Sequence, residues 1–527
     1  MRTGLTFVLA MIMLLPAISF IDGSAADDDL TYFTVDGRSY QVIDGSNVSL
    51  VYADDGYAAP EFVVGPTVTY NDVVYNIVSI SGTIDCPQIT KISIVSDILE
   101  TVESYSLEAE NLESIEVIDS NPYLEDIDGV LYNKIMSKII RFPQKKTVAG
   151  DVYDIPASVS EVCRYSFKGT SLRIINMTNN VVNIGDSAFY GCTSLERAGD
   201  SEGKLSNNLI AIGFSAFYGC TSLSSITLPD SLNYIGSYAF QDSGIGNITI
   251  PDLVEYIGEG AFAGCKNITE FEAYCRNYEA EDGVLYAMSN DSSKRVLFAY
   301  PAGKADREFT IQDDVINIDS NAFYGTVNLE RINLSRNFAS IPEDAFSGCH
   351  SLKEIDLSNV TYISSMAFYD CTGITSVNFS DKLTYIGYSA FEHTSIQTLD
   401  LPASLTYVSN SAFCQCEQLK SVNIQEGSRM TIECDVFYGC IALEKITINS
   451  KDVILEDNSL AVGSISHEAE VDVEVAKGLS IPENVGNEFT KLNISVIGER
   501  PYPYENLVAA FFCILVLIGI LYGMRQV

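Results

Sequence analysis

Phenylalanine marks a repeating pattern of apolar and polar positions along the chain. Each marker, usually preceded by alanine, follows an aliphatic residue by five positions, and most copies lie 22 or 23 residues apart. The markers are Phe167, Phe189, Phe217, Phe240, Phe262, Phe323, Phe346, Phe368, Phe391, Phe413 and Phe437. A fixed period of this length is typical of a solenoid, in which each unit buries its apolar side against its neighbours.

The other half of each unit predicts a short β-strand. It has the pattern L-x-x-I-x-L, as in residues 223–228, 352–357 and 419–424. In a strand, alternate side chains point to opposite faces, so I-x-L places two side chains inward and one outward. Stacked units would pair these strands about 4.8 Å apart. We therefore expect a parallel β-sheet along one face of the solenoid.

The combined unit "CTSLSSITLPDSLNYIGSYAF", residues 220–240, resembles the repeat of BspA-like leucine-rich-repeat cell-surface proteins. The resemblance covers about residues 80–448. It implies an α/β-type repeat solenoid, shaped as a horseshoe or arc, with a parallel sheet face and short irregular or helical convex segments. Residues 27–79 resemble the β-rich N-terminal cap of such arrays, and we expect a C-terminal β cap over 449–499. Caps are needed because an open end exposes core and strand edge.

Two intervals between successive copies of the repeat are longer than the usual period. Both carry the sequence "DGVLY", at 128–132 and 282–286, followed by an apolar run that ends in proline. An Asp-Gly pair before an apolar run is typical of a turn that leads into a hairpin. We interpret 118–150 and 274–306 as β-hairpin inserts that project from a coil. A structural role is favoured, and a dedicated binding site is the alternative.

Both ends of the chain are apolar. Residues 1–26 have the basic start, apolar core and small-residue site of a signal peptide, with an uncleaved anchor as the alternative. Residues 507–524 are eighteen apolar residues, long enough for a transmembrane helix rather than a buried core helix. A linker, 500–506, would precede this helix, and 525–527 would form a cytoplasmic tail. We expect a single-pass cell-membrane protein with an extracellular ectodomain and the membrane as one partner.

Composition excludes several classes of function. The formal net charge is −39, which repels nucleic acid, so nucleic acid is not an expected partner. The chain has three histidines, His350, His393 and His467, at unrelated repeat positions. It has no phosphate-binding glycine loop and no nucleophile elbow. We expect neither an enzyme nor a cofactor, and no metal site.

Most of the thirteen cysteines belong to the repeat. Seven lie three residues after a marker phenylalanine: Cys192, Cys220, Cys265, Cys349, Cys371, Cys416 and Cys440. Thr326 occupies this place in another copy, so the position favours a small buried side chain and a reduced thiol. Disulfides between adjacent coils remain the alternative. Cys414 and Cys434 lie outside this series and form the candidate disulfide.

The outward residues of the predicted strands form the candidate partner-binding face. They are Ser93, Glu116, Asn176, Thr227, Thr249, Glu272, Asn333, Asp356, Asn378, Asp400, Asn423 and Thr447. All are small and polar or acidic, which suits either a merely solvated face or an adhesive face with many weak polar contacts. The family resemblance implies adhesion to a protein or glycan ligand at the cell surface. A structural envelope protein without a specific ligand is the alternative, and the oligomeric state stays open.

Overall fold

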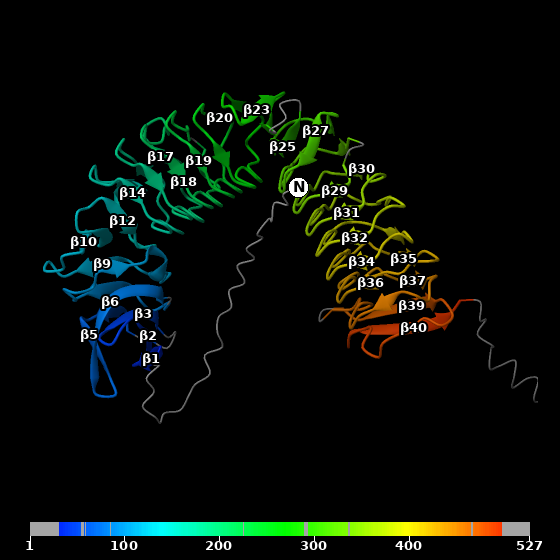
Figure 1. Ribbon diagram of the computed structural model, residues 1–527, viewed down its shortest axis with the longest axis horizontal. Helices are drawn as coiled ribbons and strands as arrows, with labels where there is room; N and C mark the ends of the chain where they lie inside the picture. The colour runs from blue at the N-terminus through cyan, green and yellow to red at the C-terminus, as the bar shows by residue number, and fades with distance from the viewer. Residues whose placement is uncertain are drawn as a thin grey trace, which may run out of the picture.

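The computed structural model describes residues 31–53, 57, 59–84, 86–224, 226–288, 294–335, 338–464 and 467–497. The predicted signal peptide and membrane helix lie outside these residues. No helix among the described residues is both long and apolar enough to cross a membrane. The described chain is a solenoid bent into an arc, with the N-terminal cap at the end of one arm and β40 at the end of the other (Figure 1).

The L-x-x-I-x-L strands stack in parallel along the outer side of the arc, and we name them the outer ladder (Figure 1). In sequence order they are β4 (Glu61–Val64), β7 (Lys91–Ile94), β9 (Ser114–Val117), β13 (Val152–Asp154), β15 (Ile174–Asn176), β17 (Arg197–Gly199), β20 (Ile248–Ile250), β22 (Phe271–Ala273), β26 (Glu308–Thr310), β28 (Arg331–Asn333), β30 (Glu354–Ile355), β33 (Thr398–Leu401), β35 (Ser421–Ile424), β37 (Lys445–Ile448), β39 (Ala469–Val475) and β40 (Thr490–Val496).

A second series of mostly two-residue strands, the middle ladder, contains the aliphatic residue five positions before each phenylalanine. Its strands are β8 (Thr101–Val102), β10 (Leu124–Ile127), β11 (Val130–Asn133), β12 (Lys138–Arg141), β14 (Glu161–Val162), β16 (Asn183–Ile184), β18 (Ala211–Ile212), β19 (Tyr234–Ile235), β21 (Tyr256–Ile257), β23 (Tyr278–Glu281), β24 (Val284–Met288), β25 (Arg295–Ala299), β27 (Val315–Ile318), β29 (Ser340–Ile341), β31 (Tyr362–Ile363), β32 (Tyr385–Ile386), β34 (Tyr407–Val408), β36 (Thr431–Ile432) and β38 (Ile454–Leu455).

The segment around each phenylalanine is a tight turn on the inner side of the arc, and we call it the inner turn. In the coil that ends at Cys192, both Ser187 (φ 52°) and Gly191 (φ 68°) are left-handed, which prevents a helix from forming. Backbone bonds join successive turns instead: the N–H of Phe189 donates to the carbonyl of Ala216 (2.8 Å).

Of the expected short irregular or helical segments, the described residues show the irregular kind, so the chain is a parallel-strand solenoid with almost no helix. Apart from the 3₁₀ turns η1 (Ser104–Ser106) and η2 (Ala149–Asp151), every described element is a strand. The irregular segments lie on the inner side, while the parallel strands follow the outer, convex side (Figure 1). The solenoid of stacked parallel-strand repeats is as predicted.

The phenylalanines form the spine of the core. All eleven are buried, and their rings stack from coil to coil, as between Phe217 and Phe240 (5.3 Å, 2°) and between Phe240 and Phe262 (5.7 Å, 4°). The apolar core falls into three clusters that meet at the two inserts. The array is thus built from three blocks that are joined at these points.

The inserts differ from the expected projecting hairpins. Each is an antiparallel meander, β10–β11–β12 or β23–β24–β25, whose last strand joins the middle ladder in parallel with β14 or β27. Phe142 and Tyr300 then take the place of the marker phenylalanine: their rings lie 5.4 Å from Phe167 and 5.1 Å from Phe323. Each insert therefore contains a coil that the phenylalanine pattern missed, although its spacing to the next marker was a usable signal.

These two additional coils act as wedges, because they lack an inner turn. The turns of the flanking coils meet across the gap: Lys168 Nζ lies 2.6 Å from Glu108 Oε1, and the N–H of Gly264 donates to the carbonyl of Tyr324 (3.2 Å). Each additional coil therefore has strands toward the outer side of the arc but no turn on the inner side. The second wedge lies at the crown of the arc, where it bends the solenoid inward (Figure 1).

The N-terminal cap is a sheet in the order β1 (Tyr32–Val35), β2 (Arg38–Val42), β3 (Asn47–Ala53), β6 (Val73–Ile84) and β5 (Thr67–Tyr70). Its strand β6 pairs with β8, so the cap continues into the middle ladder.

The C-terminal end is less enclosed than expected. β39 and β40 extend the outer ladder in parallel, and the inward residue Ile494 of β40 is exposed.

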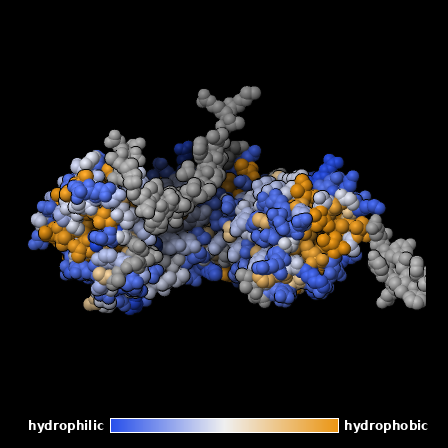
Figure 2. Space-filling view, turned by 90° about the horizontal axis from the view of Figure 1, so that it is seen from below, coloured by the Kyte–Doolittle hydropathy of each residue, from blue (hydrophilic) through white to orange (hydrophobic). Residues whose placement is uncertain are grey.

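Seen from below, hydrophobic residues gather in one patch on each arm (Figure 2).

Candidate binding surface

The outer ladder places its outward side chains in register from coil to coil. Amide groups bridge neighbouring coils: Asn176 Nδ2 donates to Asp154 Oδ1 (2.6 Å), and Asn423 Nδ2 donates to Asp400 Oδ1 (2.6 Å). Asn333 Nδ2 likewise donates to Thr310 Oγ1 (3.0 Å). The face is therefore a row of polar groups that the parallel register holds in fixed positions.

The structure places eleven of the twelve predicted outward residues at exposed or half-buried positions. Seven are exposed: Glu116, Thr227, Thr249, Glu272, Asp356, Asn378 and Asp400. Asn176, Asn333, Asn423 and Thr447 are half-buried. Ser93 is buried, with only 7% of its surface exposed, because its hydroxyl donates to Glu61 on the neighbouring strand. Strand alternation predicts the direction in which a side chain points, but it does not predict whether longer neighbouring side chains bury it.

The outer ladder is interrupted, unlike the middle ladder over the same coils. Between β17 and β20, the described pairing is a single bridge from Lys204 to Thr227. Between β30 and β33, residues 373–380 contain no strand. At these interruptions the inward residues Ile226 and Phe379 are only partly buried. Each interruption is therefore a shallow hollow with an apolar floor and a polar rim.

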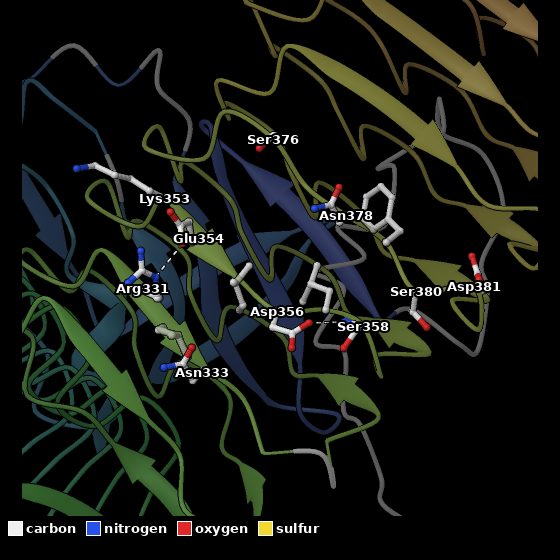
Figure 3. Close-up of a pocket in the computed structure, with 14 residues that line it drawn as sticks. Arg331, Asn333, Lys353, Glu354, Asp356, Ser358, Ser376, Asn378, Ser380 and Asp381 are labelled. Carbon is white, nitrogen blue, oxygen red and sulfur yellow. Dashed lines mark hydrogen bonds and ion pairs between the residues drawn. The ribbon is translucent and has the colours of Figure 1, made fainter.

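The largest hollow described, the Asp356 hollow, has a volume of about 660 Å³ and spans three coils. Asn333, Asp356 and Asn378 line it in successive coils, and Ser358 and Ser376 add hydroxyl groups (Figure 3). Three predicted face residues thus share one concave site. A volume of this size is ordinary for a small-molecule or side-chain pocket.

Cations in the Asp356 hollow are already paired. Arg331 Nε donates to Glu354 Oε2 (2.8 Å; Figure 3). Lys353 Nζ lies 2.9 Å from Glu330 Oε2. The hydrogen bond from Arg331 lowers the pKa of Glu354. These pairs are exposed, so they contribute little to stability. The pairs compensate the charges of Arg331 and Lys353, whereas Asp356 and Asp381 in the lining keep their negative charge.

Two more hollows lie on the same face. The Thr227 hollow, about 640 Å³, is lined by Thr227, Asn247, Thr249 and Tyr274 among others. The Asn423 hollow, about 470 Å³, lies near the C-terminal end and includes Gln425. Predicted face residues line all three hollows, so the sequence identified the correct face but not its concave sites.

The middle ladder carries tyrosines that sequence reasoning missed. Tyr362 stacks on Tyr385 (4.4 Å, 5°), and Tyr385 stacks on Tyr407 (5.7 Å, 5°). Because the rings cover one another's faces, mainly their edges and hydroxyls reach solvent. The usable signal was the tyrosine that recurs directly before the inward aliphatic residue, as in "TYIS", "TYIG" and "TYVS".

Glu433 ends this row of tyrosines. Its carboxylate accepts hydrogen bonds from Tyr407, from Ser409 Oγ (2.7 Å) and from the N–H of Asn410 (2.7 Å). Burial acts to raise the pKa of Glu433, but the hydrogen bond from Tyr407 and the two others outweigh burial and lower it. The carboxylate is thus fixed in its charged form at the edge of the middle ladder.

The repeat cysteines are buried free thiols. Each donates to the phenylalanine carbonyl of the preceding coil, as Cys220 Sγ does to Phe189 (3.1 Å). Burial raises the pKa of Cys220 well above its usual range, which makes the thiol unreactive. Thr326 contacts the next thiol, Cys349 (3.1 Å). The position requires a small hydrogen-bonding group, which cysteine, threonine and serine all supply.

Cys414 and Cys434 also carry free thiols, so no disulfide joins the candidate pair in this structure. Asn410 Nδ2 contacts Cys434 Sγ (2.6 Å). Burial raises the pKa of Cys414 to about 12, with Glu392 as a second cause. Across the described chain, no group of three or more His, Cys, Asp or Glu residues could hold a metal.

The second wedge brings carboxylates together on the inner side of the arc. Asp319 and Asp344 are half-buried, and Asn321 Nδ2 donates to Glu259 Oε1 (3.3 Å) across the wedge. Burial, reinforced by Glu259, raises the pKa of Asp319 to about 6. Burial, with Glu343 and Glu259, raises that of Asp344 to about 6. These groups are crowded because the intervening coil has no inner turn.

The stacked parallel strands, the phenylalanine spine and the tight inner turns define a leucine-rich-repeat solenoid. The family model for the BspA type leucine rich repeat region matches residues 150–269, 200–293, 304–360 and 357–465, with six copies. These matches cover more than half of the chain, and the chain belongs to this family. No curated protein matches it.

Three bacterial proteins are among the solved structures that match this chain. One is a leucine rich cell surface protein from Faecalibacterium prausnitzii, 19% identical over 82% of this chain and 98% of its own, with a TM-score of 0.44. Another is a leucine-rich repeat protein from Eubacterium ventriosum, 23% identical over 64% of this chain and 92% of its own, with a TM-score of 0.47. A third is the pneumococcal vaccine antigen PcpA, 15% identical over 88% and 98%, with a TM-score of 0.40.

Proposed function

We propose that this chain is a membrane-anchored cell-surface protein whose outer ladder binds a protein or glycan partner in adhesion. The observation that supports this proposal is the outer ladder itself. It is a rigid, in-register polar face with three hollows, and predicted face residues line each hollow. Repeat proteins bind partners on an extended surface of the solenoid, usually the concave one; in this chain the polar hollows lie along the outer ladder instead. The expected signal peptide and membrane helix would hold it outside the cell.

Adhesion requires that the face be accessible and specific. Partner capture can be measured with cells that display the full chain, against the quadruple variant Thr249→Ala, Asp356→Ala, Asn378→Ala, Asp400→Ala. All four side chains are exposed, so each substitution should change stability by no more than about 0.5 kcal/mol. We expect capture of partner cells to fall strongly.

The matched control changes three threonines of the middle ladder: Thr361→Ala, Thr384→Ala and Thr406→Ala. Thr384 and Thr406 are exposed and Thr361 is half-buried, and each donates to a backbone carbonyl of the preceding coil. Capture by the control should match that of the unchanged protein. Equal capture by the outer-ladder variant would contradict the proposal and favour the structural envelope role.

A further inference from the structure

Tyr274 distinguishes the Thr227 hollow from the other hollows. It is the most exposed aromatic residue among those described, at 67%, and it takes the place that Pro229 and Pro251 hold in the two preceding coils. Within the described chain its ring stacks on no other ring, unlike Tyr234 and Tyr256, which stack at 5.2 Å. At least one electron-rich face of Tyr274 is therefore open to a ligand.

The charge of this hollow is also distinct. Asp230 and Asp252 line it, Glu272 lies within 3.5 Å of the Tyr274 hydroxyl, and the lining contains no lysine or arginine. Arg276 follows Tyr274 by two residues but lies outside the lining. The Asp356 hollow, in contrast, contains two cations. The charged residues in the lining of the Thr227 hollow are thus all acidic, on a chain of net charge −39, while Lys204 pairs with Thr227 from the preceding coil.

Strand pairing and hydrogen bonds hold the residues around the Thr227 hollow in place. Strand β20 pairs in register with β22. Asn247 Oδ1 accepts from the N–H of Thr269 (2.8 Å), and Thr249 Oγ1 donates to Glu272 Oε2 (3.1 Å). These bonds fix the rim before any partner arrives, which reduces the entropy that binding must overcome.

We propose that the Thr227 hollow is the docking surface for a basic segment of a partner protein. A lysine or arginine side chain of that segment lies over the open face of Tyr274, which attracts a cation through its ring quadrupole. Asp230 and Asp252 supply the opposite charge. The acidic chain attracts a basic segment from a distance and repels anionic competitors. This inference rests on the proposed function and names the chemistry of its partner.

The test uses the full chain in detergent with a fluorescent nonalysine peptide, and a set of neutral hexose oligosaccharides as the competing ligand class. We expect the peptide to bind, and Tyr274→Ala or the pair Asp230→Asn, Asp252→Asn to weaken binding about tenfold. Tyr274→Phe keeps the ring and should bind within about twofold of the unchanged chain. Raising the salt from about 0.05 M to about 0.5 M should weaken binding by a similar factor.

The pair Asp356→Asn, Asp381→Asn removes two negative charges from the Asp356 hollow and is the matched control for the aspartate pair. If it weakens peptide binding as much as the Thr227-hollow variants do, the peptide responds to overall charge and the inference is wrong. Salt-independent binding of an oligosaccharide that Tyr274→Ala abolishes would make the hollow a glycan site and would also overturn it. So would an absence of peptide binding. In each case capture of partner cells still tests the proposed function separately. Unchanged thermal unfolding confirms that each variant is folded.

Discussion

Truncation of Phe240 tests whether the phenylalanine spine holds the coils together. Its side chain is fully buried between Phe217 and Phe262, with ring separations of 5.3 and 5.7 Å. Phe→Ala in a core costs about 3–5 kcal/mol through lost burial and the cavity left behind. Because two stacked contacts of about 0.5–1.5 kcal/mol each are lost as well, we expect a destabilisation near the upper end of that range.

The loss should be local at first. In a repeat array each coil contacts only its neighbours, so Phe240→Ala should open a protease-sensitive zone over residues 236–257 before the ends unfold. Limited proteolysis with mass spectrometry locates the cuts, and urea unfolding gives the change in stability. Phe240→Leu keeps most of the apolar volume but loses both ring contacts, so it should cost about 1–3 kcal/mol, less than Phe240→Ala.

The exposed Thr227 on the same coil supplies the control. Thr227→Ala should change stability by no more than about 0.5 kcal/mol. If Phe240→Ala and Thr227→Ala had equal effects, the inward and outward assignments would be wrong. If cuts appeared first at the two ends of the solenoid, the nearest-neighbour picture would fail.

Three further predictions follow from the same geometry. Cys220→Ser retains a donor to the Phe189 carbonyl and should cost about 1 kcal/mol. Cys220→Val removes that donor, but the carbonyl still accepts from the N–H of Cys192 (3.1 Å), so the cost should stay at about 0.5–1.5 kcal/mol; in the unchanged protein, thiol labelling should need denaturation. The pKa of Asp319 is about 6 folded and about 3.9 unfolded, so stability should fall as pH rises from about 4 to about 6, by roughly 2–3 kcal/mol. Asp319→Asn should remove much of this loss in urea unfolding across pH, and an unaltered pH profile would refute it. Protease added to intact cells should degrade nearly the whole chain, and a protected ectodomain in accessible cells would contradict the predicted topology.

The sequence predicted the repeat and its inward side chains well. All eleven marker phenylalanines, from Phe167 to Phe437, lie in the core, because burial in a solenoid depends on a short motif that each coil repeats. The outward residues followed from alternation for the same reason. The seven ladder cysteines were correctly assigned as small buried side chains, although their bond to the preceding coil was not foreseen.

The remaining features depend on contacts between residues far apart in the chain, and the sequence did not predict them. Phe142 and Tyr300 lie in runs that resemble hairpins locally, and only their stacking on Phe167 and Phe323 shows that they complete coils. Of the expected irregular or helical segments, the inner turns are the irregular kind, because left-handed residues such as Ser187 recur in each of them. Ser93 is covered by Glu61, which lies 32 residues earlier.

The sequence by itself determined what is repeated: the period, the two strands of each coil, the spine and the polar character of the outer ladder. Each of these depends on residues within about one repeat of one another. The tertiary structure decided where the ladder opens into hollows and where the arc bends. Those features arise from small rotations summed over many coils and from two coils without inner turns, so no single motif encodes them. Thr227 and Tyr274 line one hollow because stacking brings their coils together.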